Sequence, residues 1–285
     1  MTQCAAIACA AVLAASPSLA GQTPTFSTRA DAVEVDVLVT ERGQVVRGLQ
    51  ASDFEVRDGG ELQQIDLVTF EQLPLSLMLA FDASDSLDAE RRAHLRRAGQ
   101  LLLAQLTDLD EAGLLTFNQR VTLGAQLSFD RARVQNALDL VRGEGRTSLI
   151  DAAYAAVVTA EAGHGRSLLI LFSDGVDSSS RLSPDAVLDV AGRSDVVVYS
   201  VSVGRMTGTT FLADLTTRTG GALIEVASSN DLGATFLQIL DEFRQRYVLT
   251  YTPRVAAERG WRELDVRVKK RRVNVRARPG YQSEP

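Results

Sequence analysis

Between residues 75 and 246 the sequence alternates short apolar runs with longer amphipathic segments, and this alternation constrains the fold more than any other feature. The run SLLILF at 167–172 is almost wholly apolar, which is typical of a strand that other structure covers on both faces. Strands that alternate with helices of about 10–15 residues are parallel and are joined by crossover helices. The sequence therefore predicts a doubly wound α/β fold, in which helices flank a mostly parallel sheet.

The expected elements follow one another in a regular order along this region. We expect strands at 77–81, 112–117, 121–127, 167–172, 196–203 and 222–226. We expect helices at 88–106, 131–141, 148–162, from Ser183-Pro184 onward, from about Thr210 onward, and at 231–246.

The segments on either side of this region have a different periodicity. Valine occupies every second position from 33 to 39, and similar alternation recurs at 247–251 and 264–268. A period of two is the pattern of antiparallel strands with one buried face. Pieces near or below about 40 residues rarely fold alone. We therefore expect residues 27–72 and 247–281 to pair as one small β-sandwich, with an α/β domain at 73–246 inserted between them.

The first 20 residues are predicted to be a secretory signal peptide. They carry no charge, residues 5–15 form a continuous apolar run, and Ser18-Leu19-Ala20 resembles a signal-peptidase site. No Lys or Arg precedes the apolar run, so a buried N-terminal helix is the alternative. Cleavage after Ala20 removes Cys4 and Cys9, the only cysteines. We expect an exported protein, periplasmic or extracellular, that has no disulfide.

The rest of the sequence limits the kinds of partner. No apolar run reaches the roughly 18 residues that span a bilayer, so we expect no membrane span. From Gln245 onward the formal charge is +7, against −13 for the residues before it, and Lys269-Lys270-Arg271-Arg272 is the densest basic run. Such a run is either an anionic-surface patch or a solvated hairpin turn beside charged edge strands. We favour the turn and expect no nucleic-acid partner.

Oxygen-bearing side chains gather where the predicted strands end. Asp82, Ser84 and Ser86 follow the strand at 77–81, Asp174 follows the strand at 167–172, and Thr147 precedes a predicted helix. In an open α/β sheet, ligands bind outside the carboxyl ends of the strands. Carboxylates and hydroxyls are hard ligands that suit Mg²⁺. The alternative for each residue is a helix cap, and Ser86 could cap the helix that begins near Asp88.

The order D-x-S-x-S, then Thr, then Asp resembles the metal-ion-dependent adhesion site of von Willebrand factor A (VWFA) domains, as found in integrins. Further segments are similar to a secreted bacterial subfamily of these domains. They are Val-Leu-Val-Thr at 37–40, Gly-Leu-Gln-Ala-Ser-Asp-Phe-Glu-Val at 48–56, Thr219-Gly220-Gly221, Tyr247-Val-Leu-Thr-Tyr251, and Arg278-Pro-Gly-Tyr281. The likeness covers nearly the whole chain after the predicted leader.

The resemblance implies a Rossmann-like domain with Mg²⁺ held by Asp82, Ser84, Ser86, Thr147 and Asp174, with Mn²⁺ or Ca²⁺ as alternatives. It also implies a protein partner that presents a carboxylate to the open position of the ion. The chain departs from the family at Asp85, where a neutral residue is usual, and at Leu87, where Met is frequent. We expect Asp85 either to weaken attraction for an acidic partner or to favour Ca²⁺ or Mn²⁺.

Three functional hypotheses follow, and we favour a non-enzymatic adhesion-type binding module. A metal-dependent hydrolase or phosphotransferase is the second hypothesis, but the chain has no G-x-S-x-G or G-x-x-x-x-G-K-[ST] motif. Its only histidines are His94, expected on a helix surface, and His164, expected in a Gly-flanked loop. The third hypothesis is a structural envelope component whose metal only stabilises loops.

Overall fold

A computed structural model describes residues 32–70, 73–173, 176–204, 210–253 and 260–283. The predicted leader and both cysteines lie outside the described residues, and so does Asp174. No helix among the described residues has both the length and the apolar character needed to cross a membrane.

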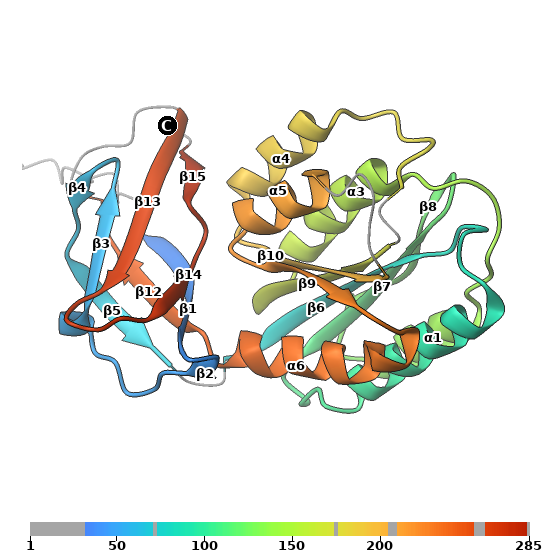
Figure 1. The fold of residues 1–285 in the computed structure, drawn as a ribbon, viewed down its shortest axis with the longest axis horizontal. Coiled ribbons are helices and arrows are strands. Elements are labelled where there is room, and N and C mark those ends of the chain that lie inside the picture. The colour runs from blue at the N-terminus through green and yellow to red at the C-terminus, as the bar shows by residue number, and fades with distance from the viewer. Residues whose placement is uncertain (1–31, 71–72, 174–175, 205–209, 254–259, 284–285) are drawn as a thin grey trace, which may run out of the picture.

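A six-stranded sheet forms the centre of the α/β region (Figure 1). Its strands, in spatial order, are β11 (Ala222–Val226), β10 (Val197–Val203), β9 (Arg166–Phe172), β6 (Leu75–Asp82), β7 (Glu111–Phe117) and β8 (Val121–Ser128). All neighbouring pairs are parallel except β7 and β8, which form an antiparallel pair. The prediction of a mostly parallel sheet is therefore confirmed.

Helices cover both faces of this sheet. They are α1 (Ala89–Leu103), α2 (Arg131–Asp139), α3 (Leu149–Glu161), α4 (Pro184–Arg193), α5 (Thr210–Arg218) and α6 (Leu232–Arg244), with a short 3-10 turn, η2 (Ser229–Asp231), before α6. The helices α1, α2 and α6 share one apolar core with the sheet, and α3, α4 and α5 share the core on its other face. Helices on both faces of a mostly parallel sheet are the arrangement that the sequence predicts.

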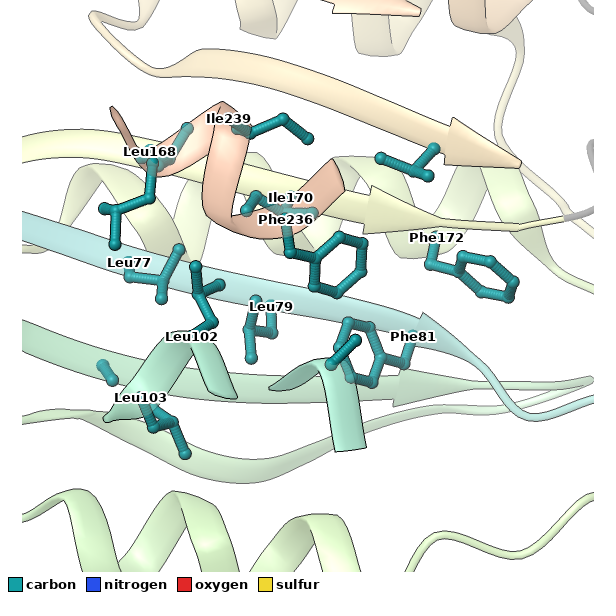
Figure 2. Close-up of a cluster of buried hydrophobic side chains, with 14 of the residues drawn as sticks. Leu77, Leu79, Phe81, Leu102, Leu103, Leu168, Ile170, Phe172, Phe236 and Ile239 are labelled. Atoms are coloured by element: carbon teal, nitrogen blue, oxygen red, sulfur yellow. The ribbon is translucent and has the colours of Figure 1, made fainter. Parts of the chain in front are cut away.

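Burial on both faces explains why the strands are apolar at consecutive positions. In β6, Leu77, Leu79 and Phe81 point toward α1 and α6 (Figure 2). Met78 and Ala80 belong to the core on the other face of the sheet, which includes α3. Every residue of β6 is buried. Truncating one such leucine to alanine typically costs about 2–5 kcal/mol, so this core is a main source of stability.

Strands from the two flanks of the chain pair with each other. The N-terminal flank contains β1 (Val33–Glu41), β2 (Gln44–Val45), the 3-10 turn η1 (Ala51–Asp53), β3 (Phe54–Asp58), β4 (Glu61–Leu62) and β5 (Ile65–Thr69). The C-terminal flank contains β12 (Tyr247–Tyr251), β13 (Gly260–Val268), β14 (Asn274–Arg276) and β15 (Gly280–Ser283). One sheet has the order β14-β1-β12-β5 and the other β15-β13-β3-β4, and their inward side chains share one core. The domain limits 27–72, 73–246 and 247–281 stay a prediction.

The β region contacts the α/β region at the end where the parallel strands begin. Arg166, the first residue of β9, forms an ion pair with Asp36 of β1. Arg278 Nη1 lies 2.6 Å from an oxygen of Asp195, and the Arg218 guanidinium stacks 3.9 Å from the ring centre of Trp261. The carboxyl ends of the same strands therefore lie at the edge of the sheet away from the β region.

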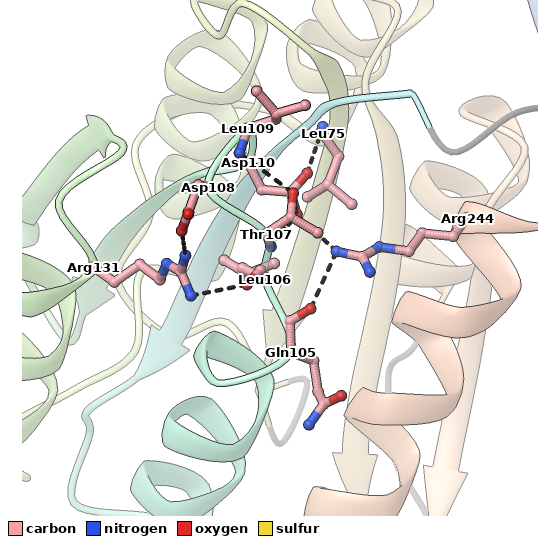
Figure 3. A network of polar contacts seen from close by, with 9 residues as sticks. All are labelled: Leu75, Gln105, Leu106, Thr107, Asp108, Leu109, Asp110, Arg131 and Arg244. Atoms are coloured by element: carbon pink, nitrogen blue, oxygen red, sulfur yellow. Dashed lines mark hydrogen bonds and ion pairs between the residues drawn. The ribbon is translucent and has the colours of Figure 1, made fainter.

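A buried carboxylate organises the start of the sheet. Asp110 Oδ1 accepts a hydrogen bond from Leu75 N at 3.1 Å, and Oδ2 accepts from Thr107 N at 2.6 Å (Figure 3). Arg244, the last residue of α6, donates to Asp110 Oδ2 at 2.7 Å and to Gln105 O at 3.3 Å. These contacts fix the end of α6 against the start of β6, directly before the chain enters β12.

Candidate functional site

The strands β6 and β9 are neighbours at the point where the strand order reverses. After β6 the chain forms β7 and β8 on one side of this strand, and then β9, β10 and β11 on its other side. Their register pairs Phe81 with Phe172, so Asp82 and Ser173 follow at the same level. Ligand crevices in open α/β sheets form at such a switch point, beyond the carboxyl ends of the strands. The structure therefore places the end of β6 where a ligand site is expected.

Asp82 is the fully buried acid at this point, with an exposed fraction of 0%. Its Oδ1 accepts a hydrogen bond from Ser84 N at 2.9 Å, and its Oδ2 accepts one from the Ser173 hydroxyl at 2.9 Å. These contacts fix the orientation of the carboxylate. Ser173 is a site residue that the sequence interpretation did not select, although it directly precedes Asp174.

Ser84 and Ser86 place their hydroxyls side by side, since the two Oγ atoms are 2.6 Å apart. Ser84 is buried and Ser86 is exposed. The alternative that Ser86 caps the next helix is wrong, because the N-cap of α1 is Asp88, whose carboxylate accepts from Arg91 N at 2.8 Å. The cap is thus supplied two residues later, and the Ser86 hydroxyl faces Ser84 instead.

Thr147 reaches the same place through a loop that pairs with the D-x-S-x-S segment. Glu144 N donates to Ala83 O at 2.9 Å, and Asp85 N donates to Gly145 O at 3.0 Å. These two main-chain bonds align residues 144–147 with residues 83–86. Thr147 is buried at the end of this loop.

The segment after Asp174 holds Thr147 from the other side. Thr147 N donates to the Ser178 hydroxyl at 3.0 Å, and Thr147 O accepts from Ser178 N at 2.9 Å and from Ser179 N at 3.0 Å. Arg146 also donates to Ser178 O. The loops that carry Asp82, Thr147 and the residues after Asp174 are therefore joined by direct hydrogen bonds.

The segment after Asp174 also caps α3, from which it is distant in the sequence. The Asp177 carboxylate accepts from Leu149 N at 2.9 Å, and the Ser180 hydroxyl accepts from Ile150 N at 3.0 Å and from Asp151 N at 3.1 Å. These are the first three N–H groups of α3, which have no partner inside the helix. The expected site did not include these residues, but the run Asp-Ser-Ser-Ser at 177–180 is the signal that could have indicated them.

The structure thus brings four of the five predicted ligand residues into one set of connected loops. Asp82, Ser84 and Ser86 are linked by direct contacts, and Thr147 by loop pairing, whereas Asp174 lies outside the described residues. Among the described residues, no group of three or more His, Cys, Asp or Glu is placed to hold a metal ion. The predicted site depends instead mainly on hydroxyl oxygens.

The spacing of the hydroxyls can be compared with the geometry of Mg²⁺. Two neighbouring ligands of an octahedral Mg²⁺ at about 2.0–2.1 Å lie roughly 2.9 Å apart. The 2.6 Å between Ser84 Oγ and Ser86 Oγ is close to this value, so a small increase in their distance would let both atoms coordinate one ion. The donor set present therefore fits a hard divalent cation.

Other predicted features lie elsewhere in the fold. The basic run Lys269–Arg272 is exposed and occupies the turn between β13 and β14, as the turn interpretation expects, but the two strands lie in different sheets, so the turn joins the two sheets and does not close a hairpin. His94 Nδ1 lies 2.9 Å from Ser229 Oγ, so this histidine is half-buried rather than on the free surface. His164 Nδ1 lies 3.0 Å from Glu111 Oε1, at the opposite edge of the sheet from Asp82.

Comparison with known proteins identifies the fold. No protein-family model matches the chain, and no curated protein sequence matches it significantly. Among solved structures, proximal thread matrix protein 1 from the mussel byssus is 17% identical, with a TM-score of 0.54 over 64% of this chain and 49% of that one. A conserved hypothetical protein, BatB, from Bacteroides thetaiotaomicron is 15% identical, with a TM-score of 0.50 over 59% of this chain and 98% of that one.

Another structure of the mussel protein is described as having a zinc-occupied MIDAS motif, where MIDAS stands for metal-ion-dependent adhesion site. It is 16% identical to this chain, with a TM-score of 0.55 over 65% of this chain and 49% of that one. These structures and this chain are all mixed α/β proteins. Their common fold is VWA-like, that is, similar to the fold of von Willebrand factor A domains. At such low identity the similarity is one of fold. This chain spans about half the length of the mussel protein.

Proposed function

We propose that this protein is an exported, non-enzymatic binding module of the VWA type. In this proposal Asp82, Ser84, Ser86, Thr147 and Asp174 hold one divalent cation, Mg²⁺ first among the candidates. A carboxylate from a partner protein completes the coordination of the ion. The observation that carries the proposal is the 2.6 Å pair of hydroxyls beside the buried Asp82, at the switch point of the sheet.

The chemistry of these residues suits capture of an acid. Hydroxyl ligands are neutral, so an ion held largely by them keeps its attraction for an incoming anion. A unit-charge pair about 4 Å apart gives roughly 4 kcal/mol at an effective dielectric constant near 20, before desolvation. That attraction orients a carboxylate, while the surrounding loops must supply specificity. The mussel protein with a zinc-occupied MIDAS motif supports a divalent ion on this fold.

The positions of the two histidines favour binding over hydrolysis. A hydrolase that activates serine needs a general base within hydrogen-bond reach of the hydroxyl. The chain has only two histidines, and each contacts a residue outside the five predicted ligands, His94 contacting Ser229 and His164 contacting Glu111. The two site serines face each other. We therefore propose that these hydroxyls serve as ligands rather than nucleophiles.

Metal binding is tested by calorimetry and thermal unfolding of the purified protein with Mg²⁺ and with EDTA. At a Mg²⁺ concentration of about 100 times Kd, binding to the folded state alone adds about 2.7 kcal/mol of stability. At about 2–4 °C per kcal/mol, the Tm should rise by roughly 5–11 °C. The Ser84→Ala/Ser86→Ala variant should lose this rise.

Asp88→Ala is the matched control, because Asp88 lies two residues beyond the site and caps α1. Loss of the cap should lower the Tm in EDTA by the equivalent of about 1 kcal/mol and leave the Mg²⁺-dependent rise intact. Equal Tm values with Mg²⁺ and EDTA in the unaltered protein would contradict the metal site.

Partner capture is tested separately, by pull-down from cell envelope and culture medium in Mg²⁺ or EDTA. The proposal expects a protein retained only in Mg²⁺ and lost with Asp82→Ala. A Tm that responds to Mg²⁺ without any metal-dependent capture would favour the structural alternative. Turnover of an ester or phosphate substrate that Asp82→Ala abolishes would favour the hydrolase or phosphotransferase.

A further inference from the structure

A hollow of about 250 Å³ lies beside the candidate site, between α2 and the ends of β7 and β8. We call it the Ala83 hollow, because Ala83 lines it together with residues of these three elements, of the loop between β7 and β8, and of the loop after α2. Small-molecule sites usually enclose about 300–1,000 Å³. This hollow is smaller, so it suits one side chain of a larger partner better than a free ligand.

The Ala83 hollow is continuous with the site itself. Ala83 stands between Asp82 and Ser84, its N–H donates to Phe117 O at 2.7 Å, and its carbonyl accepts from Glu144 N at 2.9 Å. Consecutive Cα atoms are about 3.8 Å apart, and an extended peptide advances about 3.3 Å per residue. One short extended segment can therefore reach both the ion position and the hollow.

The lining of the hollow combines apolar surface with positive charge. Leu140 is 71% exposed at its rim, and Val141, Ala137 and Gly124 line it further. Among the described residues that line it, only Arg120 and Arg142 are charged.

Neither arginine forms an ion pair with a carboxylate of the described residues. Arg142 donates to Asp139 O and Val141 O through a single nitrogen, Nη1, so its other nitrogen atoms remain available to a partner. Asp85 and Glu144 are exposed on the neighbouring loops, but neither lines the hollow. An available guanidinium pairs readily with a carboxylate.

The hollow on the other side of the site has the opposite charge. It measures about 430 Å³ and lies between the start of α3, α4 and α5, and its charged lining residues within the described ranges are Asp177, Asp185 and Asp214. The strand order places it on the β9–β10 side of the site, whereas the Ala83 hollow lies on the β7–β8 side. An acidic segment that leaves the site is therefore attracted toward Arg120 and Arg142.

We propose that the partner segment is an acidic and aliphatic peptide that crosses from the metal site into the Ala83 hollow. One carboxylate of the peptide binds the ion, an aliphatic side chain within about three residues enters the hollow, and a second carboxylate pairs with Arg120 and Arg142. This inference rests on the proposed metal-dependent function, and it adds the chemistry and the direction of the bound segment.

A phage-displayed library of random heptapeptides tests the inference. The library is bound to the intact protein in Mg²⁺ and eluted with EDTA, and the selected sequences are then measured as synthetic peptides. We expect the selected peptides to carry two acidic residues and a Leu, Ile or Val within three positions. Replacing each arginine with alanine should weaken binding roughly 2- to 5-fold, as for an exposed ion pair.

Arg120→Ala/Arg142→Ala is the decisive variant, and Arg193→Ala is its control. Arg193 is an exposed arginine at the end of α4, outside both hollows. We expect the double variant to keep its Mg²⁺ affinity in calorimetry, to bind the selected peptides more weakly, and to stop selecting the second acid. The control should behave as the unaltered protein does.

Three results overturn the inference, and together they separate its failure from failure of the proposed function. If EDTA-eluted peptides lack the second acid, or bind the double variant unchanged, the Ala83 hollow is not the docking surface, although metal-dependent binding stands. If no peptide is eluted by EDTA while calorimetry shows Mg²⁺ binding, carboxylate capture fails as well. Absence of Mg²⁺ binding in calorimetry removes the metal site itself.

Discussion

Replacing Asp58 with asparagine should destabilise the β region more than any surface substitution. Asp58, the last residue of β3, is completely buried. Its Oδ1 accepts from Arg262 Nε of β13 at 2.6 Å, and its Oδ2 accepts from the hydroxyls of Tyr251 of β12 and Tyr281 of β15, both at 3.0 Å. One carboxylate therefore connects three strands of the C-terminal flank to the N-terminal flank.

The magnitude follows from what the substitution would leave behind. The asparagine side chain keeps the shape of the carboxylate but not its charge, so Arg262 loses its counter-ion while its side chain is only 14% exposed. Removing one partner of a buried ion pair costs about 3–5 kcal/mol. The residual exposure of Arg262 relieves part of that cost, so we expect a loss of about 3 kcal/mol. At about 2–4 °C per kcal/mol, the Tm should fall by roughly 6–12 °C.

Urea unfolding at neutral pH, followed by circular dichroism, measures this loss directly. Asp265→Asn is the control, because Asp265 pairs with Arg267 on the surface of β13 at 2.7 Å, and such pairs contribute about 0–1 kcal/mol. If Asp58→Asn costs no more than Asp265→Asn, the buried network does not hold the flanks together, and the reasoning is refuted.

Three further predictions concern the site and the pH dependence. Ser173→Ala removes the hydroxyl that orients Asp82, so calorimetry should show Mg²⁺ binding weakened about 10- to 100-fold; unchanged affinity would contradict the orienting role. Burial raises the pKa of Tyr199 to about 12. The stability that this shift contributes is fully present below about pH 10 and is lost as the pH rises to about 12. Tyrosinate absorbance and circular dichroism should therefore change together in that interval. Burial raises the pKa of Glu111, but hydrogen bonds, first from the His164 main chain, outweigh it and lower the pKa overall. Glu111→Gln should thus remove stability near pH 7 and little near pH 3, as measured by urea unfolding.

Local patterns in the sequence were enough to predict most of the α/β region. The apolar run at 167–172 became β9, and the Ser183-Pro184 start became α4, where Ser183 caps the helix by accepting from Ala186 N at 3.3 Å. Both signals depend on neighbouring residues only, since a strand's apolar run and a helix cap act within a few positions. The ends of several helices differ by a few residues from the expected ones, because helix ends fray.

The contacts that complete the site could not be predicted in this way. The cap of α3 comes from Asp177 and Ser180, which lie 28 and 30 positions after the N–H groups that they accept from. The Asp58 network joins residues 193 to 223 positions apart. Such contacts exist only after the chain has folded. A run such as Asp-Ser-Ser-Ser at 177–180 indicates candidate polar residues, but it does not indicate which helix they cap. The position of the Ala83 hollow depends in the same way on how α2 packs against β7 and β8.

The arrangement of the two regions bears on the size of the partner. The β region meets the α/β region where the parallel strands begin, through Arg166 and Asp36, and α6 leads directly into β12 at that end (Figure 1). The loops with Asp82, Ser84 and Thr147 lie at the opposite edge, which the β region does not cover. A stable protein interface usually buries more than about 1,000 Å². The described part of the β region leaves this edge open, and a hollow lies on each side of the site, so a bound protein could make contacts in both directions from the ion. This geometry favours a macromolecular partner for the proposed site.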